Sequence, residues 1–286
     1  MLKSTFCHVP GIGIQQEQRL WSSGVLSWEE ISRVEKNGLS GQTVRSLASH
    51  IDESFQRLER NDPGYFTEML PSNQIWRVFP DFRHSIAYLD IETTGLGYGD
   101  SITTISVYDG RSVYCYIRGH NLEDFLKDIR KYSLIVTYNG KCFDVPFIEK
   151  AFNTKLHQAH IDLRYVLSSL GHRGGLKACE KRFGLDRKEL ENVDGFLAVL
   201  LWREYQRNRN QKALETLLAY NIQDVVNLET LLVRAYNLNL IPTPFSETYR
   251  LQEPVTPHIP FAADRETIER ISHRTSWRGG GFRRWR

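Results

Sequence analysis

The chain has 286 residues, a formal net charge of +3 at pH 7 and an isoelectric point near 8.6, a balance that excludes neither acidic nor neutral partners. Apolar residues make up 41% of it, enough for one large domain with an appendage or for two domains. Its four cysteines are scattered, which argues against a zinc site or a disulfide framework, and it has no membrane-length apolar run or signal-peptide core. We therefore expect a soluble, cytoplasmic protein without a membrane partner.

The first 80 residues predict a helical region. A turn at Gly11–Gly13 opens a helix that ends at Ser22, and a longer amphipathic helix runs from Gly41 to Leu58. The Gly-Ile-Gly turn is compatible with a helix-hairpin-helix, in which backbone N–H groups bind phosphate. No second apolar helix completes that motif, so we favour a packing turn in a small helical cap.

From His84 the pattern changes to short runs rich in Ile, Val, Thr and Tyr, which predict strands. Asp109-Gly110 is a strong hairpin signal between two of them. The predicted strands cover 85–91, 101–108, 112–117, 134–138 and 159–163, with helices over 122–131 and 144–152 between the later ones. This order predicts an α/β fold with a mixed five-stranded sheet and helices on its faces.

After the fifth strand the pattern is helical. The predicted helices cover 164–170, 176–183, 195–206, 211–222 and 224–238. Five prolines between 242 and 260 predict an extended strap, and a surface helix follows over 263–272. We divide the chain into a helical region (1–80), a sheet domain (81–240) and a strap with a tail (241–286).

The tail over 274–286 combines five arginines with two tryptophans and a phenylalanine on glycine hinges. Such a composition could contact phosphates and stack on bases. It is equally compatible with a disordered, solubilising end, and the sequence does not decide between the two.

The first predicted strand ends in Asp90-Ile91-Glu92. Alternate residues of a strand face the same side, so both carboxylates lie within reach of one ion. Buried carboxylates repel each other unless a cation or a basic partner compensates, and no Lys or Arg lies within this stretch. Mg²⁺ or Mn²⁺ is the simplest compensation, and two solvated acids at a strand end are the alternative.

Two later acids stand at positions from which they could join this pair. Asp144 lies at a predicted helix start directly after a strand end, where the helix dipole favours negative charge, although a simple N-cap would use the same residue type. Tyr220 and Asp224 share one face of a helix whose flanks are apolar. Asp162 is a further acid on the fifth strand, which we interpret first as the N-cap of the next helix.

The ordered set of motifs resembles the DEDD 3′–5′ exonucleases, in the variant that carries a tyrosine. The motifs are Asp90-x-Glu92, Asn139-Gly140-x-x-Phe143-Asp144 and Tyr220-x-x-x-Asp224. The segments Gly175–Leu185 and Tyr220–Leu228 are similar to the YprB-type ribonuclease H-like domain. The resemblance covers roughly residues 5–240 and implies a ribonuclease H-like sheet with an N-terminal helical cap.

The resemblance implies two Mg²⁺ or Mn²⁺ ions at the four acids, Asp90, Glu92, Asp144 and Asp224. In this interpretation Tyr220 orients or deprotonates the attacking water, and the substrate is the single-stranded 3′ end of DNA or RNA. Further residues near the pocket are candidates for contact with nucleic acid, and a solvated surface is the alternative for the basic ones. These candidates are Thr93, Asn139, Lys141, His172, Arg173 and Lys177.

Two other functions are compatible with the same fold. One is a non-catalytic nucleic-acid-binding module, which has no reason to retain four mutually repulsive acids. The other is a structure-specific endonuclease, which would cut a circular substrate. The motifs do not distinguish DNA from RNA, because contact with a 2′-hydroxyl depends on local geometry.

Overall fold

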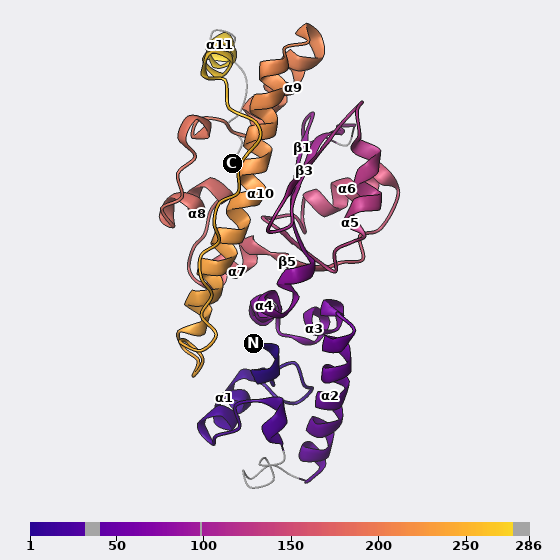
Figure 1. The fold of residues 1–286 in the computed structure, drawn as a ribbon, viewed down its shortest axis with the longest axis vertical. Helices are drawn as coiled ribbons and strands as arrows, with labels where there is room; N and C mark the ends of the chain where they lie inside the picture. Colours follow the sequence, from indigo (N-terminus) through magenta and orange to yellow (C-terminus); the bar gives the residue numbers. More distant parts are fainter. Residues whose placement is uncertain (32–40, 98, 277–286) are drawn as a thin grey trace.

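A mixed five-stranded sheet lies at the centre of the larger end of the molecule in the computed structural model (Figure 1). Its strand order is β3-β2-β1-β4-β5, with β1 antiparallel to β2 and parallel to β4. The strands are β1 (Ile86–Thr93), β2 (Ile102–Tyr108), β3 (Val113–Ile117), β4 (Leu134–Thr137) and β5 (Ala159–Asp162). The predicted α/β fold with a mixed sheet is confirmed, and every strand lies within two residues of its expected bounds.

The structure describes residues 1–31, 41–97 and 99–276. The arginine- and aromatic-rich end of the chain, from residue 277 onward, lies outside the described residues, so the choice between a nucleic-acid contact and a solubilising end stays open. Across the described ranges, none of the helices combines the length and the apolar character that crossing a bilayer requires.

The two faces of β1 are buried against different helices. Leu89 and Ile91 belong to the apolar cluster that contains helices α5 (Phe125–Ile129) and α6 (Asp144–Phe152), whereas Tyr88 belongs to the cluster with α10. Because side chains alternate along a strand, Asp90 and Glu92 share the face of Tyr88 and point toward α10. The local pattern of β1 therefore decides which helix can complete a site with these acids.

Helix α10 (Gln211–Leu240) runs along that face of the sheet and is buried over most of its length (Figure 1). The expected break at Gln223, between two helices, is wrong. No glycine or proline interrupts the segment, so the backbone hydrogen-bond ladder continues through it. This continuity holds Tyr220 and Asp224 rigidly on successive turns of one helix.

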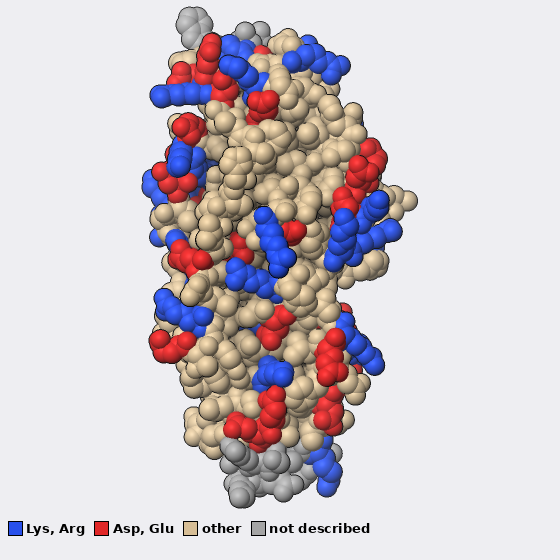
Figure 2. All heavy atoms as spheres, viewed as in Figure 1, with Lys and Arg blue, Asp and Glu red and all other residues tan. Residues whose placement is uncertain are grey.

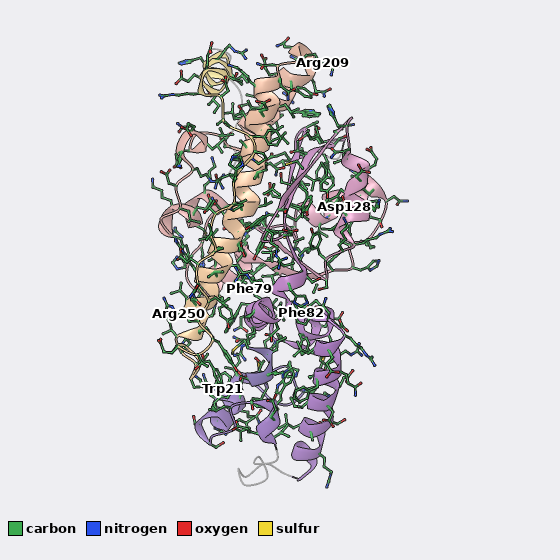
Figure 3. All side chains as sticks on the ribbon, in the orientation of Figure 1. Trp21, Phe79, Phe82, Asp128, Arg209 and Arg250 are labelled. Carbon is green, nitrogen blue, oxygen red and sulfur yellow. The ribbon has the colours of Figure 1, made fainter. Side chains whose placement is uncertain are left out.

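Three more helices and a strap surround α10. The helices are α7 (Leu163–Ser169), α8 (Leu176–Arg182) and α9 (Gly195–Asn208), and α9 turns back into α10 at Arg209, labelled in Figure 3. The proline-containing strap then runs back along α10 to α11 (Arg265–Ser276), as Figure 1 shows. Asn237 fixes the strap by donating to the Leu251 carbonyl and accepting from the Leu251 amide, both at 2.9 Å.

The N-terminal residues form a helical region at the other end of the molecule (Figure 1). Ile12 of the Gly-Ile-Gly turn is buried in its apolar core, as a packing turn requires. Phe79 and Phe82 lie where this region meets the sheet (Figure 3). Its helices are α1 (Ile14–Ser22), α2 (Gly41–Glu59), α3 (Pro63–Met69) and α4 (Phe79–Phe82), with short 3-10 turns at Leu2–Ser4, Ser72–Val78 and Arg83–Ser85. Two further 3-10 turns, Leu122–Asp124 and Lys188–Leu190, lie in the sheet domain.

Candidate metal centre

Three carboxylates meet between β1 and α10. One oxygen from each of Asp90, Glu92 and Asp224 lies within 4.8 Å of the others. The two strand residues approach from the sheet, and Asp224 approaches from the helix that covers it. Three oxygen ligands at this spacing suit a hard divalent cation such as Mg²⁺ or Mn²⁺.

Asp144 lies beside this group. It is the first residue of α6, and Phe143 occupies the N-cap position, so Asp144 is not the helix cap that its position in the sequence also allowed. Its Oδ1 accepts a hydrogen bond of 3.1 Å from the backbone N–H of Ile91, between the two strand acids. The fourth predicted acid is thus hydrogen-bonded to the backbone of the strand that carries the first two.

Burial and mutual repulsion disfavour the ionised form of these acids. Burial, followed by the charge of Asp224, raises the pKa of Asp90 and that of Glu92 well above their ordinary range. Burial also raises the pKa of Asp144 to about 7, against the opposing effect of the hydrogen bond from Ile91. The four acids offer closely spaced oxygen ligands, and the positive charge around them is too small to balance their negative charge. A bound divalent cation would supply the missing positive charge.

Asn221 fixes the orientation of Asp90. Its Nδ2 donates to Asp90 Oδ2 at 2.6 Å, and its Oδ1 accepts from Ser106 Oγ at 2.7 Å and from Thr104 Oγ1 at 3.1 Å. Two hydroxyl groups of β2 therefore hold the amide in the orientation in which it binds the carboxylate. The sequence analysis missed this residue, although a polar side chain on the sheet-facing side of a buried helix is a detectable signal.

Arg187 is a second residue that the sequence analysis missed. It is 3% exposed, and its guanidinium forms an ion pair with Asp224. Its Nη2 also donates to Glu180 Oε1 at 2.6 Å. The expected compensation by Mg²⁺ or Mn²⁺ is corrected in part here, because this arginine already compensates part of the charge. It arrives from the loop after α8, and no motif marks it.

Tyr220 lies beneath two cations. The guanidinium carbon of Arg187 is 5.6 Å from the centre of its ring, and Lys177 Nζ is 5.4 Å from it. Burial, followed by the charge of Asp224, raises the pKa of Tyr220 well above its ordinary range, so the phenol is neutral. Lys177, expected to contact nucleic acid, instead donates to the carbonyl oxygens of Glu191 at 3.2 Å and of Val193.

The other expected contact residues lie at three places. Thr93 is buried at the end of β1, and Asn139 and the exposed Lys141 lie on the turn that leads to Asp144. His172 and Arg173 lie between α7 and α8, where the ring of His172 is 4.7 Å from that of Phe183. Figure 2 shows Lys and Arg intermingled with Asp and Glu on the face that it draws, so the charge of that face does not mark a binding surface by itself.

Comparison with known sequences identifies a family. Residues 87–236, just over half of the chain, match the model of the RNase_H superfamily. The uncharacterized protein YprB of Bacillus subtilis (strain 168) is 28% identical over 219 residues, which cover 66% of this chain and 50% of YprB. The chain thus spans about half the length of this curated relative.

Two solved structures also match this chain, each with low sequence identity. Brucella melitensis NrnC with bound Mg²⁺ has 17% sequence identity and a TM-score of 0.40, over 73% of this chain and 94% of NrnC. The family B DNA polymerase of the hyperthermophilic archaeon Pyrobaculum calidifontis has 18% identity and a TM-score of 0.40, over 55% of this chain and 24% of the polymerase.

Proposed function

The chain belongs to the RNase H superfamily, and on this basis we propose that it is a metal-dependent 3′–5′ exonuclease of the DEDD type that acts on single-stranded nucleic acid. The observation that carries the proposal is the meeting of Asp90, Glu92 and Asp224 within 4.8 Å. A nuclease of this family needs such a group where β1 ends, because phosphodiester hydrolysis requires concentrated positive charge next to the scissile phosphate.

The residues that would hold the ions are Asp90, Glu92 and Asp224, with Asp144 beside them. Two Mg²⁺ or Mn²⁺ ions, when bound, acidify a water molecule and neutralise the leaving oxygen. The carboxylates also need fixed directions, and Asn221 supplies that for Asp90 while Arg187 supplies it for Asp224.

The phenol of Tyr220 is the remaining group of the proposed active site. Asp224 is one helical turn away on the same face, and the elevated pKa of the phenol keeps its proton in place near neutral pH. A neutral phenol both donates and accepts hydrogen bonds, so Tyr220 orients the attacking water through its hydroxyl. Arg187 and Lys177 over its ring restrict where that hydroxyl points.

The test compares linear and circular single strands. With Mg²⁺ or Mn²⁺, a 5′-labelled linear oligonucleotide should give a ladder of products shortened from the 3′ end, and a circle should stay intact. Matched DNA and RNA strands identify the preferred sugar. Absence of hydrolysis by the intact protein, or an unchanged rate in Asp90→Ala, refutes the proposal, and cleavage of the circle indicates an endonuclease instead.

A further inference from the structure

An exposed tyrosine and two exposed cations lie on the turn that leads to Asp144 and on the first turn of α7, which contacts it. Tyr165 is 52% exposed, and Lys141 and Arg164 are exposed beside it. Tyr165 OH lies 3.5 Å from Cys142 Sγ, so the first turn of α7 contacts the turn after β4. We call Lys141, Arg164 and Tyr165 the edge platform, because they lie at the β5 edge of the sheet.

The edge platform is held by one buried carboxylate. Asp162 accepts hydrogen bonds from the backbone N–H of Asn139 at 2.7 Å and from those of Lys141 and Arg164 at 3.1 Å. The expected N-cap role of Asp162 is therefore confirmed, and the same carboxylate also ties the preceding turn to the helix. This anchoring fixes the backbone that presents all three side chains.

A second set of contacts tightens the same turn. Asn139 adopts a left-handed backbone conformation with φ of 67°, and its Oδ1 accepts from the Arg164 guanidinium. A Cβ on Gly140 would stand 2.2 Å from Thr137 Oγ1, so only glycine fits there. These contacts fix the backbone of the turn, so a ligand that binds there does not have to order that backbone.

The edge platform adjoins the acidic centre through the same short piece of chain. Asp144 follows Lys141 by three positions along the chain, and the Val145 amide donates to the Gly140 carbonyl at 2.9 Å. The turn thus leads directly into an acid of the centre, and it carries Lys141 of the edge platform. A strand that reached the acids with its end could lie across these side chains.

The chemistry of the edge platform matches single-stranded nucleic acid. An exposed aromatic ring offers a stacking surface to any base, and neighbouring cations offer contacts to phosphates. Asp162, the carboxylate at the end of β5 that holds this turn, is buried and already accepts three backbone donors, so it does not oppose an approaching polyanion at the surface.

We propose that Lys141, Arg164 and Tyr165 form a subsite for single-stranded DNA or RNA, in which Tyr165 stacks on a base and the two cations contact neighbouring phosphates. The subsite rests on the proposed function in one respect, since it places the 3′ end of the strand toward the acidic centre. Strand binding itself needs no hydrolysis, so the two proposals can fail separately.

The experiment measures binding of a fluorescent single-stranded oligonucleotide by anisotropy in EDTA, where hydrolysis cannot proceed. Tyr165→Ala should weaken binding roughly tenfold through the loss of one stacked base, and Tyr165→Trp should retain it. Tyr114→Ala is the matched control, because Tyr114 is 41% exposed on β3, the opposite edge strand, and this variant should bind like the wild type. Thermal unfolding of each variant verifies that the fold is intact.

A strand built from abasic nucleotides isolates the stacking. Tyr165→Ala should bind this strand as the wild type does, whereas Lys141→Ala and Arg164→Ala should weaken binding to both strands and lower the salt dependence. Equal binding of the normal strand by Tyr165→Ala and the wild type overturns the subsite, as does an equal loss on the abasic strand. If the subsite behaves as described but Mg²⁺ or Mn²⁺ yields no hydrolysis, only the proposed function fails.

Discussion

Two regions of this molecule bury carboxylates, and the charge of these carboxylates is compensated differently in each region. In the N-terminal region, Glu17 Oε1 accepts from Arg77 Nη1 at 2.8 Å and from the amides of Phe6 and Cys7 at 2.7 and 3.0 Å. At the sheet, Asp90, Glu92 and Asp224 crowd within 4.8 Å with partial compensation from Arg187 and Asn221. In the first arrangement a buried arginine of the chain itself compensates the carboxylate, whereas we propose that the second takes up a cation from solution.

The largest effect should come from removing one acid of the centre. Asp90→Asn takes away a metal ligand at nearly constant volume, so hydrolysis should fall at least ~10³-fold, corresponding to several kcal/mol of transition-state stabilisation. Initial rates on a labelled oligonucleotide measure this. The same variant should be as stable as the wild type without metal, or more so, because it relieves repulsion. If the hydrolysis rate of Asp90→Asn equals that of the wild type, the acids at the sheet do not act as catalytic metal ligands, and the contrast between the two regions is wrong.

Removing the N-terminal acid should have the opposite signature. Glu17→Gln leaves Arg77 buried without a counter-charge, and breaking such a buried pair costs about 3–5 kcal/mol. Urea unfolding measures the loss, and hydrolysis by the remaining folded protein should change little. A stable Glu17→Gln variant would mean that the two clusters are less different than their contacts indicate.

The metal-free protein should lose stability as pH rises. Burial raises the pKa of Asp90, Glu92 and Asp144 in the folded state, the last to about 7. The stability that they contribute is complete below their unfolded pKa, near 4, and is lost as pH passes the folded values. Melting temperatures between pH 5 and 8 in EDTA test the sign.

Added metal should reverse this loss at the upper end of the range. Mn²⁺ at 100 times its Kd stabilises the folded state by about 2.7 kcal/mol. The same addition at pH 5 should have a smaller effect, because protons then compete for the carboxylates. Melting curves that are flat with pH, or insensitive to Mn²⁺, contradict the uncompensated charge described for the centre.

A smaller effect is expected from the residue that orients Asp90. Asn221→Ala removes the amide but leaves every carboxylate, so metal affinity should fall about 10–100-fold without abolishing binding. Calorimetric titration with Mn²⁺ measures the change. Asn237→Ala is a matched control on the same helix, because Asn237 bonds to Leu251 of the strap and not to an acid of the centre. Identical losses in the two variants would indicate a general loosening of α10.

Most of the fold could be predicted from periodicity, because the strands alternate and the helices carry apolar faces. The acids could be predicted because Asp90 and Glu92 lie on one strand face and Tyr220 and Asp224 on one helix face. The role of Arg187 could not be predicted, because its place beside Asp224 depends on how the loop after α8 folds over α10. The single helix α10 was missed because polar Gln223 weakens the apolar pattern without breaking the backbone ladder.

The domain division at residues 80 and 240 stays a prediction, as do the catalytic roles of individual residues. Local patterns reveal which residues share an element, and long-range packing decides which elements share a site. Asp162 illustrates both levels, since its role as a helix cap follows from its neighbours in sequence. Its hold on the turn before Asp144 follows only from the packing of β4 against β5.

Anomalous diffraction from crystals grown with Mn²⁺ tests the central claim most directly, because it locates the ion. The account predicts a manganese peak bounded by the carboxylates of Asp90, Glu92 and Asp224, and its loss in crystals of Asp90→Asn. Crystals saturated with Mn²⁺ in which these carboxylates hold no ion, and Arg187 alone compensates Asp224, would contradict it.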